Sequence, residues 1–138
     1  MVGLSAEPID VDAVRHAVDD PGFGAVLVFE GVARNSFAGR RVVQLAYEAY
    51  EELAIPVLQR IVDDVAERFG GKCAIVHRTG PVPIEEPTVV IAVGTPHRAA
   101  CYEASRFALE ELKAKLPVWK REIYDDGQAW KANEVPDE

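Results

Sequence analysis

The chain has 138 residues, 49% of them hydrophobic, and a formal net charge of −8 at pH 7. This length fits one ordinary domain with its own core, so we expect a single domain over residues 1–138, in which residues 134–138 form a frayed tail. The acidic balance argues against a general nucleic-acid binder, and no apolar run reaches the ~20 residues that a membrane-spanning helix needs.

The first part of the chain is expected to form one short helix and two strands. The helix can begin after Asp10, whose side chain is suited to cap it, and ends before the turn residues at 19–22. Residues 24–31 and 42–47 are typical of strands, and the polar segment 34–40 between them predicts a mobile loop. We expect these two strands to pair antiparallel.

The middle of the chain combines an amphipathic helix with two further strands. In residues 53–69 the apolar side chains recur at helical spacing, while charged side chains face away from them. Pro56 falls near the start of this helix, so it lies either in the first turn or at a kink. Residues 73–77 and 88–93 are strand-like, and the turn-rich segment 80–87 separates them.

A second long helix is expected over residues 97–116. It must stop there, because Pro117 disfavours a helical conformation at the residue before it and lacks the N–H that would continue the ladder. Residues 118–124 and 128–133 flank a turn at 125–127 and predict a C-terminal hairpin. This order of elements predicts an α+β domain with a largely antiparallel sheet and two main helices.

Basic residues gather locally against the overall acidic charge. Four cations lie in residues 113–122 (KAKLPVWKRE), around a proline and a tryptophan. Two His-Arg pairs, His77-Arg78 and His97-Arg98, each adjoin a strongly apolar run. Arg78 is expected either to serve a site or to pair with an acidic neighbour. Together these cations indicate a site for a small anionic substrate.

Several segments form a specific pattern when their order and spacing are taken together. They are 24–34 (GAVLVFEGVAR), 45–54 (LAYEAYEELA), 76–80 (VHRTG), His97-Arg98, 112–122 (LKAKLPVWKRE), Gly127 and Trp130. On this pattern, which covers nearly the whole chain, the protein resembles the large, catalytic subunit of molybdopterin synthase. The resemblance implies an α/β-hammerhead-like arrangement of the expected α+β fold.

The resemblance also implies an activity, a partner and an assembly. The family converts cyclic pyranopterin monophosphate into molybdopterin by inserting two sulfur atoms as a dithiolene. The sulfur would come from the C-terminal Gly-Gly thiocarboxylate of a small ubiquitin-like subunit. Two large subunits would form a central homodimer with one small subunit at each end, a heterotetramer. We expect no cofactor and no metal, because molybdenum enters later in the pathway.

The resemblance carries specific site residues over to this sequence. They are the catalytic Lys113 and Lys120 and the substrate-binding Arg34, His97, Arg98, Phe29 and Arg121. The break at Pro117 lets the two lysines converge, and guanidinium groups match the oxygens of a phosphate. One lysine would neutralise the thiocarboxylate and the oxyanion formed as sulfur leaves it, and the other would transfer protons; the sequence does not assign which.

Two alternatives remain open at the level of the sequence. A non-catalytic anion- or nucleotide-binding module would hold a ligand with the same cations and would need no partner. An enzyme with its own thiol chemistry would depend on Cys73 or Cys101, although no Cys-His pairing supports it. The two isolated cysteines fit core positions in a protein of the reducing cytoplasm. We also expect no signal peptide, which fits the same location. The tryptophans Trp119 and Trp130 are also expected in the core.

Overall fold

The computed structural model describes residues 1–132, with side chains up to residue 127. The expected tail at 134–138, residue 133 of the expected last strand and the side chain of Trp130 lie outside this description. The elements in chain order are β1 (Val2–Ser5), α1 (Val11–His16), β2 (Ala25–Val32), β3 (Ser36–Phe37), β4 (Arg40–Ala49), α2 (Glu51–Phe69), β5 (Lys72–Arg78), β6 (Gly80–Pro83), β7 (Pro87–Thr95), α3 (Arg98–Lys115), β8 (Val118–Tyr124) and β9 (Gly127–Ala132).

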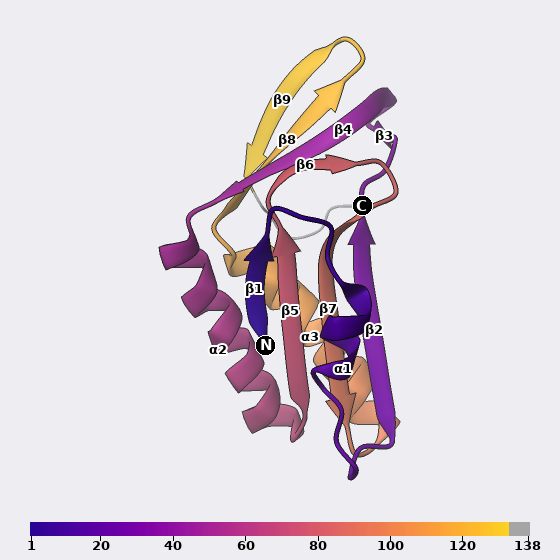
Figure 1. Cartoon of the computed structure of the whole chain (residues 1–138), viewed down its shortest axis with the longest axis vertical. Helices are drawn as coiled ribbons and strands as arrows, with labels where there is room; N and C mark the ends of the chain where they lie inside the picture. Colours follow the sequence, from indigo (N-terminus) through magenta and orange to yellow (C-terminus); the bar gives the residue numbers. More distant parts are fainter. Residues whose placement is uncertain (133–138) are drawn as a thin grey trace.

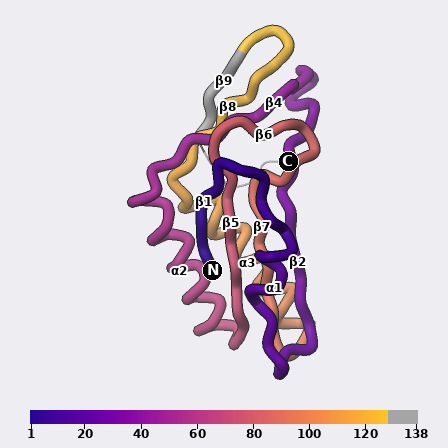
Figure 2. The backbone as a smooth tube through the Cα atoms, in the orientation of Figure 1, coloured from indigo at the N-terminus to yellow at the C-terminus, as the bar shows by residue number. Residues whose placement is uncertain are grey.

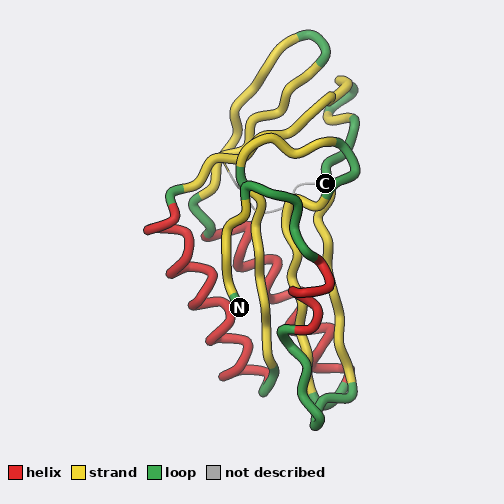
Figure 3. The backbone as a smooth tube through the Cα atoms, in the orientation of Figure 1, coloured by secondary structure: helices red, strands yellow, loops and turns green. Residues whose placement is uncertain are grey.

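The described strands form two sheets. The first has the order β1-β5-β7-β2, in which only β1 and β5 pair parallel. The second has the order β3-β4-β8-β9, and β6 also pairs with β4. The second sheet lies across one end of the first (Figure 1), and helices accompany only the first sheet (Figure 3). The expected α+β class, with largely antiparallel pairing and a C-terminal hairpin, is confirmed.

Both faces of the first sheet are covered, which explains why its strands are nearly continuous apolar runs. The helices α2 and α3 pack on one face, where Leu58 and Leu112 meet Ile75 and Ile91 in the main core. The short helix α1 covers the other face, and its Val14 belongs to a second apolar cluster there. The central strand β7 is therefore buried on both sides.

The pairing expected between residues 24–31 and 42–47 is wrong. Strand β2 pairs with β7, with Phe29 opposite Ile91, whereas β4 pairs with β6 and β8 in the other sheet. The chain passes from one sheet to the other after a bulge between Gly31 and Val32. Figure 2 shows the consequence, because β4 runs beside β8, which is far from it in sequence.

The helix boundaries follow the capping signals in the sequence. The carboxylate of Asp10 accepts the N–H of Ala13 at 3.0 Å, and α3 ends before Pro117 as predicted. Pro56 lies beyond the first turn of α2, which continues through it. None of the described helices combines the length and the apolar character that crossing a membrane requires. Trp119 is 39% exposed, so its predicted place in the core is wrong.

Gly71 is expected to tolerate no side chain, because the start of β5 lies against the end of β7. A Cβ atom at this position would lie 2.4 Å from the main-chain oxygen of Gly94. Gly71→Ala should therefore lower the free energy of unfolding by about 1–3 kcal/mol, the range for overpacking. Gly3→Ala in β1 is the control, because a Cβ at Gly3 meets nothing within 4 Å. It should change the free energy of unfolding by less than about 0.5 kcal/mol. Urea unfolding of both variants checks this, and equal midpoints would contradict the close approach.

Candidate active site

A cavity of about 320 Å³ opens where the two sheets meet the C-terminal part of α3. Its walls come from the end of β2 and the segment after it, from β4 and β8 of the second sheet, from the start of β7 and from α3. The cavity thus depends on both sheets, and no single element of the chain could form it. Its volume is in the range of small-molecule sites.

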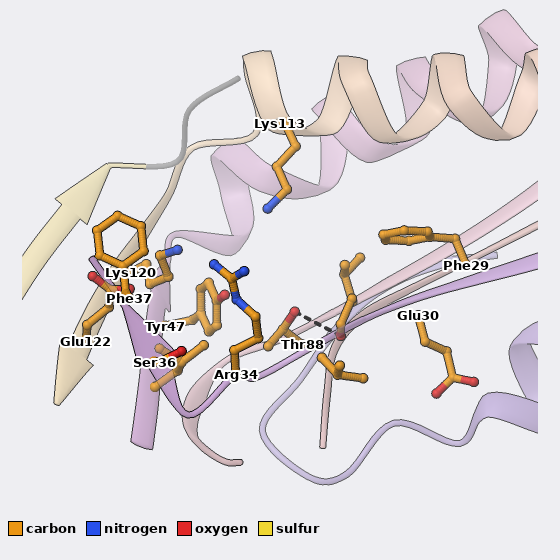
Figure 4. Close-up of a pocket in the computed structure, with 14 residues that line it drawn as sticks. Phe29, Glu30, Arg34, Ser36, Phe37, Tyr47, Thr88, Lys113, Lys120 and Glu122 are labelled. Carbon is orange, nitrogen blue, oxygen red and sulfur yellow. Dashed lines mark hydrogen bonds between the residues drawn. The ribbon is translucent and has the colours of Figure 1, made fainter. Parts of the chain in front are cut away.

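Three cations from different elements converge on this cavity. Lys113 reaches in from α3, Lys120 from β8 and Arg34 from the segment after β2 (Figure 4). Pro117 allows the two lysines to approach each other, because it ends the helix soon after Lys113 and lets the chain turn into the strand that carries Lys120. Of the predicted residues, the structure therefore brings together Lys113, Lys120 and Arg34. Phe29 also lines the cavity.

A buried carboxylate lies among these cations, and the sequence analysis missed it. Glu122 is 3% exposed, lines the cavity and accepts a hydrogen bond from the Tyr124 hydroxyl at 2.7 Å. It stands two positions after Lys120 on β8, so both side chains face the same side of the sheet. Strand alternation after Lys120 is the signal that could have identified it. A carboxylate here offsets part of the charge that the cations bring together.

Two aromatic rings contact each other at this site, and of the two only Tyr47 lines the cavity. Tyr47 lies opposite Lys120 in the strand register, and burial raises its pKa to about 12, so its hydroxyl remains protonated. The buried ring of His77 contacts the Tyr47 ring edge-on at 4.9 Å between centroids. Nδ1 of His77 donates to the main-chain oxygen of Arg78 at 2.7 Å. Burial lowers the pKa of His77 to about 4, and the nearby charge of Lys113 adds to this effect.

Other predicted site residues lie away from this cavity in the single chain. His97 is the N-cap of α3 and Arg98 its first residue, and both are exposed. With a rise of 1.5 Å per residue, Arg98 lies about 22 Å along the helix from Lys113. Arg121 follows Lys120 on β8 and so points to the opposite side of the strand. The binding roles of these three residues stay predictions.

Several remaining candidates have structural partners. Arg78 forms an ion pair with Glu86 at 2.6 Å, one of the two outcomes expected for it. Cys73 and Cys101 are buried in the main core, as predicted, and burial raises the pKa of Cys73 to about 12, so a nucleophilic thiolate is disfavoured there. Among residues 1–132, no group of His, Cys, Asp or Glu side chains could hold a metal ion.

Fold and site together define an α+β protein with two sheets, whose basic cavity is suited to a small anion. A family model described as "MoaE protein" matches residues 4–115. The chain is 41% identical over 134 residues to the human molybdopterin synthase catalytic subunit, covering 96% of this chain and 71% of that one. It therefore belongs to the MoaE family, which confirms the resemblance and gives it an enzymatic role in molybdopterin biosynthesis.

Solved structures agree with this membership. Molybdopterin synthase from Staphylococcus aureus superposes with a TM-score of 0.89 at 39% identity, covering 93% of this chain and 94% of that chain. A chain from the complex of subunits 1 and 2 of molybdopterin-converting factor from Helicobacter pylori has a TM-score of 0.80 at 19% identity, covering 98% and 93%. The second likeness shows the fold alone.

Proposed function

We propose that the chain is a sulfurtransferase, the catalytic subunit of a molybdopterin synthase. It transfers sulfur from the C-terminal thiocarboxylate of a small ubiquitin-like subunit to cyclic pyranopterin monophosphate and so forms the dithiolene of molybdopterin. The observation that carries the proposal is the convergence of Lys113, Lys120 and Arg34 on one cavity of a MoaE-family fold. The cavity is of a size that fits a small-molecule substrate.

The charge of the cavity suits the two reactants. Cyclic pyranopterin monophosphate and a thiocarboxylate are both anions, so they repel each other unless cations lie between them. Arg34 is placed to bind the phosphate through its planar guanidinium group. Lys113 and Lys120 reach the cavity from two different elements, α3 and β8 (Figure 4), so the reacting groups can meet both.

The chemistry divides into steps that these groups can assist. The thiocarboxylate sulfur forms a bond to a carbon of the substrate while a C–O bond at the same carbon breaks, and the oxygen leaves on the phosphate as the cyclic ester opens or, in the other cycle, as water. The small subunit is then joined to the substrate through a thioester. Water then attacks the thioester carbonyl, the acyl C–S bond breaks, and the small subunit leaves as a carboxylate while sulfur stays on the pterin. One lysine stabilises the oxyanion of this step and the other moves protons. Two such cycles supply the two sulfur atoms.

The walls of the cavity favour these interactions. Phe29, Phe37 and Leu45 provide apolar surface beside the cations. Apolar surroundings lower the local dielectric and so strengthen the attraction between a lysine and a developing oxyanion. The protonated hydroxyl of Tyr47 is a neutral hydrogen-bonding group at the same place.

The proposal includes a partner and an assembly. The small subunit presents its Gly-Gly terminus to the cavity, and two copies of the present chain form the centre of a heterotetramer. The Helicobacter pylori chain with the same fold comes from a complex of two subunits, and we propose a two-subunit assembly for this chain as well. Because His97 and Arg98 lie about 22 Å from Lys113 in one chain, they can serve this cavity only from a second copy.

A labelling experiment tests the proposed function. The purified chain is incubated with cyclic pyranopterin monophosphate and a small subunit whose thiocarboxylate carries ³⁴S, and the pterin product is analysed by mass spectrometry. We expect a product with two ³⁴S atoms and conversion of two small-subunit thiocarboxylates to carboxylates. Binding of the pterin without any labelled product would favour the non-catalytic anion-binding module instead.

A further inference from the structure

The main chain around Arg34 is held on both sides, although Arg34 lies in a segment between strands. On one side, the Ala33 N–H donates to the Glu86 oxygen at 3.2 Å, and the Glu85 N–H donates to the Ala33 oxygen at 2.9 Å. On the other side, the Val42 N–H donates to the oxygen of Asn35 at 2.8 Å. Arg34 therefore projects into the cavity from a segment whose position depends on the turn at 85–86.

An ion pair fastens this turn to the first sheet. Arg78, at the end of β5, has a side chain that is only 7% exposed, and its Nη1 lies 2.6 Å from the Glu86 carboxylate. Leaving a buried guanidinium without its partner is costly, so the pair holds Glu86 in place. The turn itself is irregular, since Glu85 has a φ of 75°, a conformation that is unfavourable for a residue with a side chain. Such a turn needs an external contact to keep one geometry.

We infer that Arg78 and Glu86 are positioning residues for the cavity cation Arg34. The ion pair fixes the turn, the turn fixes Ala33 through two backbone hydrogen bonds, and Ala33 sets the place from which Arg34 reaches the substrate. Neither Arg78 nor Glu86 lines the cavity. The inference rests on the proposed function, in which Arg34 binds the phosphate. A preorganised Arg34 binds this anion without the cost of ordering its segment.

The test compares two neighbouring substitutions that remove the same charge. Glu86→Gln removes the ion pair, whereas Glu85→Gln alters an exposed side chain one position away. Glu86→Gln should raise the KM for cyclic pyranopterin monophosphate by about 3- to 10-fold, because ordering of Arg34 then accompanies binding. Its kcat should change by less than about 2-fold, since the lysines stay in place. Glu85→Gln should leave both constants within about 2-fold of the wild type.

Amide hydrogen exchange supplies a second measurement that does not require turnover. In Glu86→Gln the amides of Ala33 and Glu85 should exchange faster, while those of the central strand β7 should not. In Glu85→Gln neither group should change. Equal KM values for the two variants would overturn the inference, even if the turn exchanged faster. If the wild type forms no product, the proposed function fails, and unchanged exchange at Ala33 in Glu86→Gln would then overturn the positioning role by itself.

Discussion

Lys113→Ala and Lys120→Ala are each expected to lower the kcat of sulfur transfer by at least about 100-fold. Each lysine supplies charge or protons to the reacting groups in the cavity, and water cannot replace it at a fixed position. Single-turnover assays with a thiocarboxylated small subunit give the rate of the chemical step. The free energy of unfolding should change by less than about 1 kcal/mol, because both side chains are half-buried at the edge of the cavity.

Lys115→Ala is the matched control for the lysine variants. Lys115 lies two positions after Lys113 on the same helix, but its side chain is 61% exposed and pairs with Glu111 outside the cavity. This substitution should leave kcat within about 2-fold of the wild type, since exposed ion pairs contribute little. If Lys113→Ala and Lys120→Ala behaved like Lys115→Ala, the proposed catalytic role of the cavity would be wrong.

His77 is expected to make the protein less stable as the pH falls from 6.5 to 4. The pKa of His77 is lowered from 6.5 to about 4, chiefly because the ring is buried. Between these values the unfolded chain binds a proton that the folded chain does not, so protonation favours unfolding. The contribution is complete above pH 6.5 and is lost as the pH falls toward 4, and the loss by pH 4 amounts to about 3 kcal/mol of unfolding free energy.

Urea unfolding of the wild type and of His77→Asn between pH 7 and pH 4 checks this expectation. The asparagine amide can donate to the Arg78 oxygen in place of Nδ1 but does not titrate. Between pH 7 and pH 4 the variant should lose about 3 kcal/mol less unfolding free energy than the wild type. Parallel curves would contradict the expectation. Because the charge of Lys113 helps to lower this pKa, Lys113→Ala should also raise the pKa of His77 in an NMR titration.

The helices and the convergence of the lysines could be predicted from local features of the sequence. Asp10 and Pro117 act on the main chain next to them, so a cap and a helix end follow from their chemistry alone. The apolar spacing of α2 likewise needs no knowledge of what it packs against. Once the helix stops before Pro117, Lys113 and Lys120 are brought near each other.

The pairing of the strands could not be predicted in the same way. Residues 24–31 and 42–47 are adjacent in sequence and both strand-like, which favours a hairpin, but the bulge at Gly31 and Val32 directs the chain into the second sheet. The strand β1 is only four residues long, and its one pairing among the described strands is with β5, about 70 residues further along the chain. Such pairings depend on contacts between distant segments, which local propensity does not encode.

Several residues of the site likewise depend on contacts between distant segments, which the sequence alone does not reveal. Tyr47 and Glu122 belong to the cavity because β4 and β8 pair in one register, with Tyr47 opposite Lys120. A shift of β8 by one residue would turn Glu122, together with Lys120, to the other face. For His97 and Arg98, the resemblance predicts a role at the substrate pocket, but the length of α3 separates them from Lys113 in one chain.

The structure of the chain with cyclic pyranopterin monophosphate bound tests the central claim most directly. We expect the phosphate within about 3 Å of the Arg34 guanidinium, with the pterin between Lys113 and Lys120. We also expect His97 and Arg98 near the ligand only where a second copy of the chain supplies them. A pterin bound away from the cavity, with neither lysine in contact, would contradict the proposed active site.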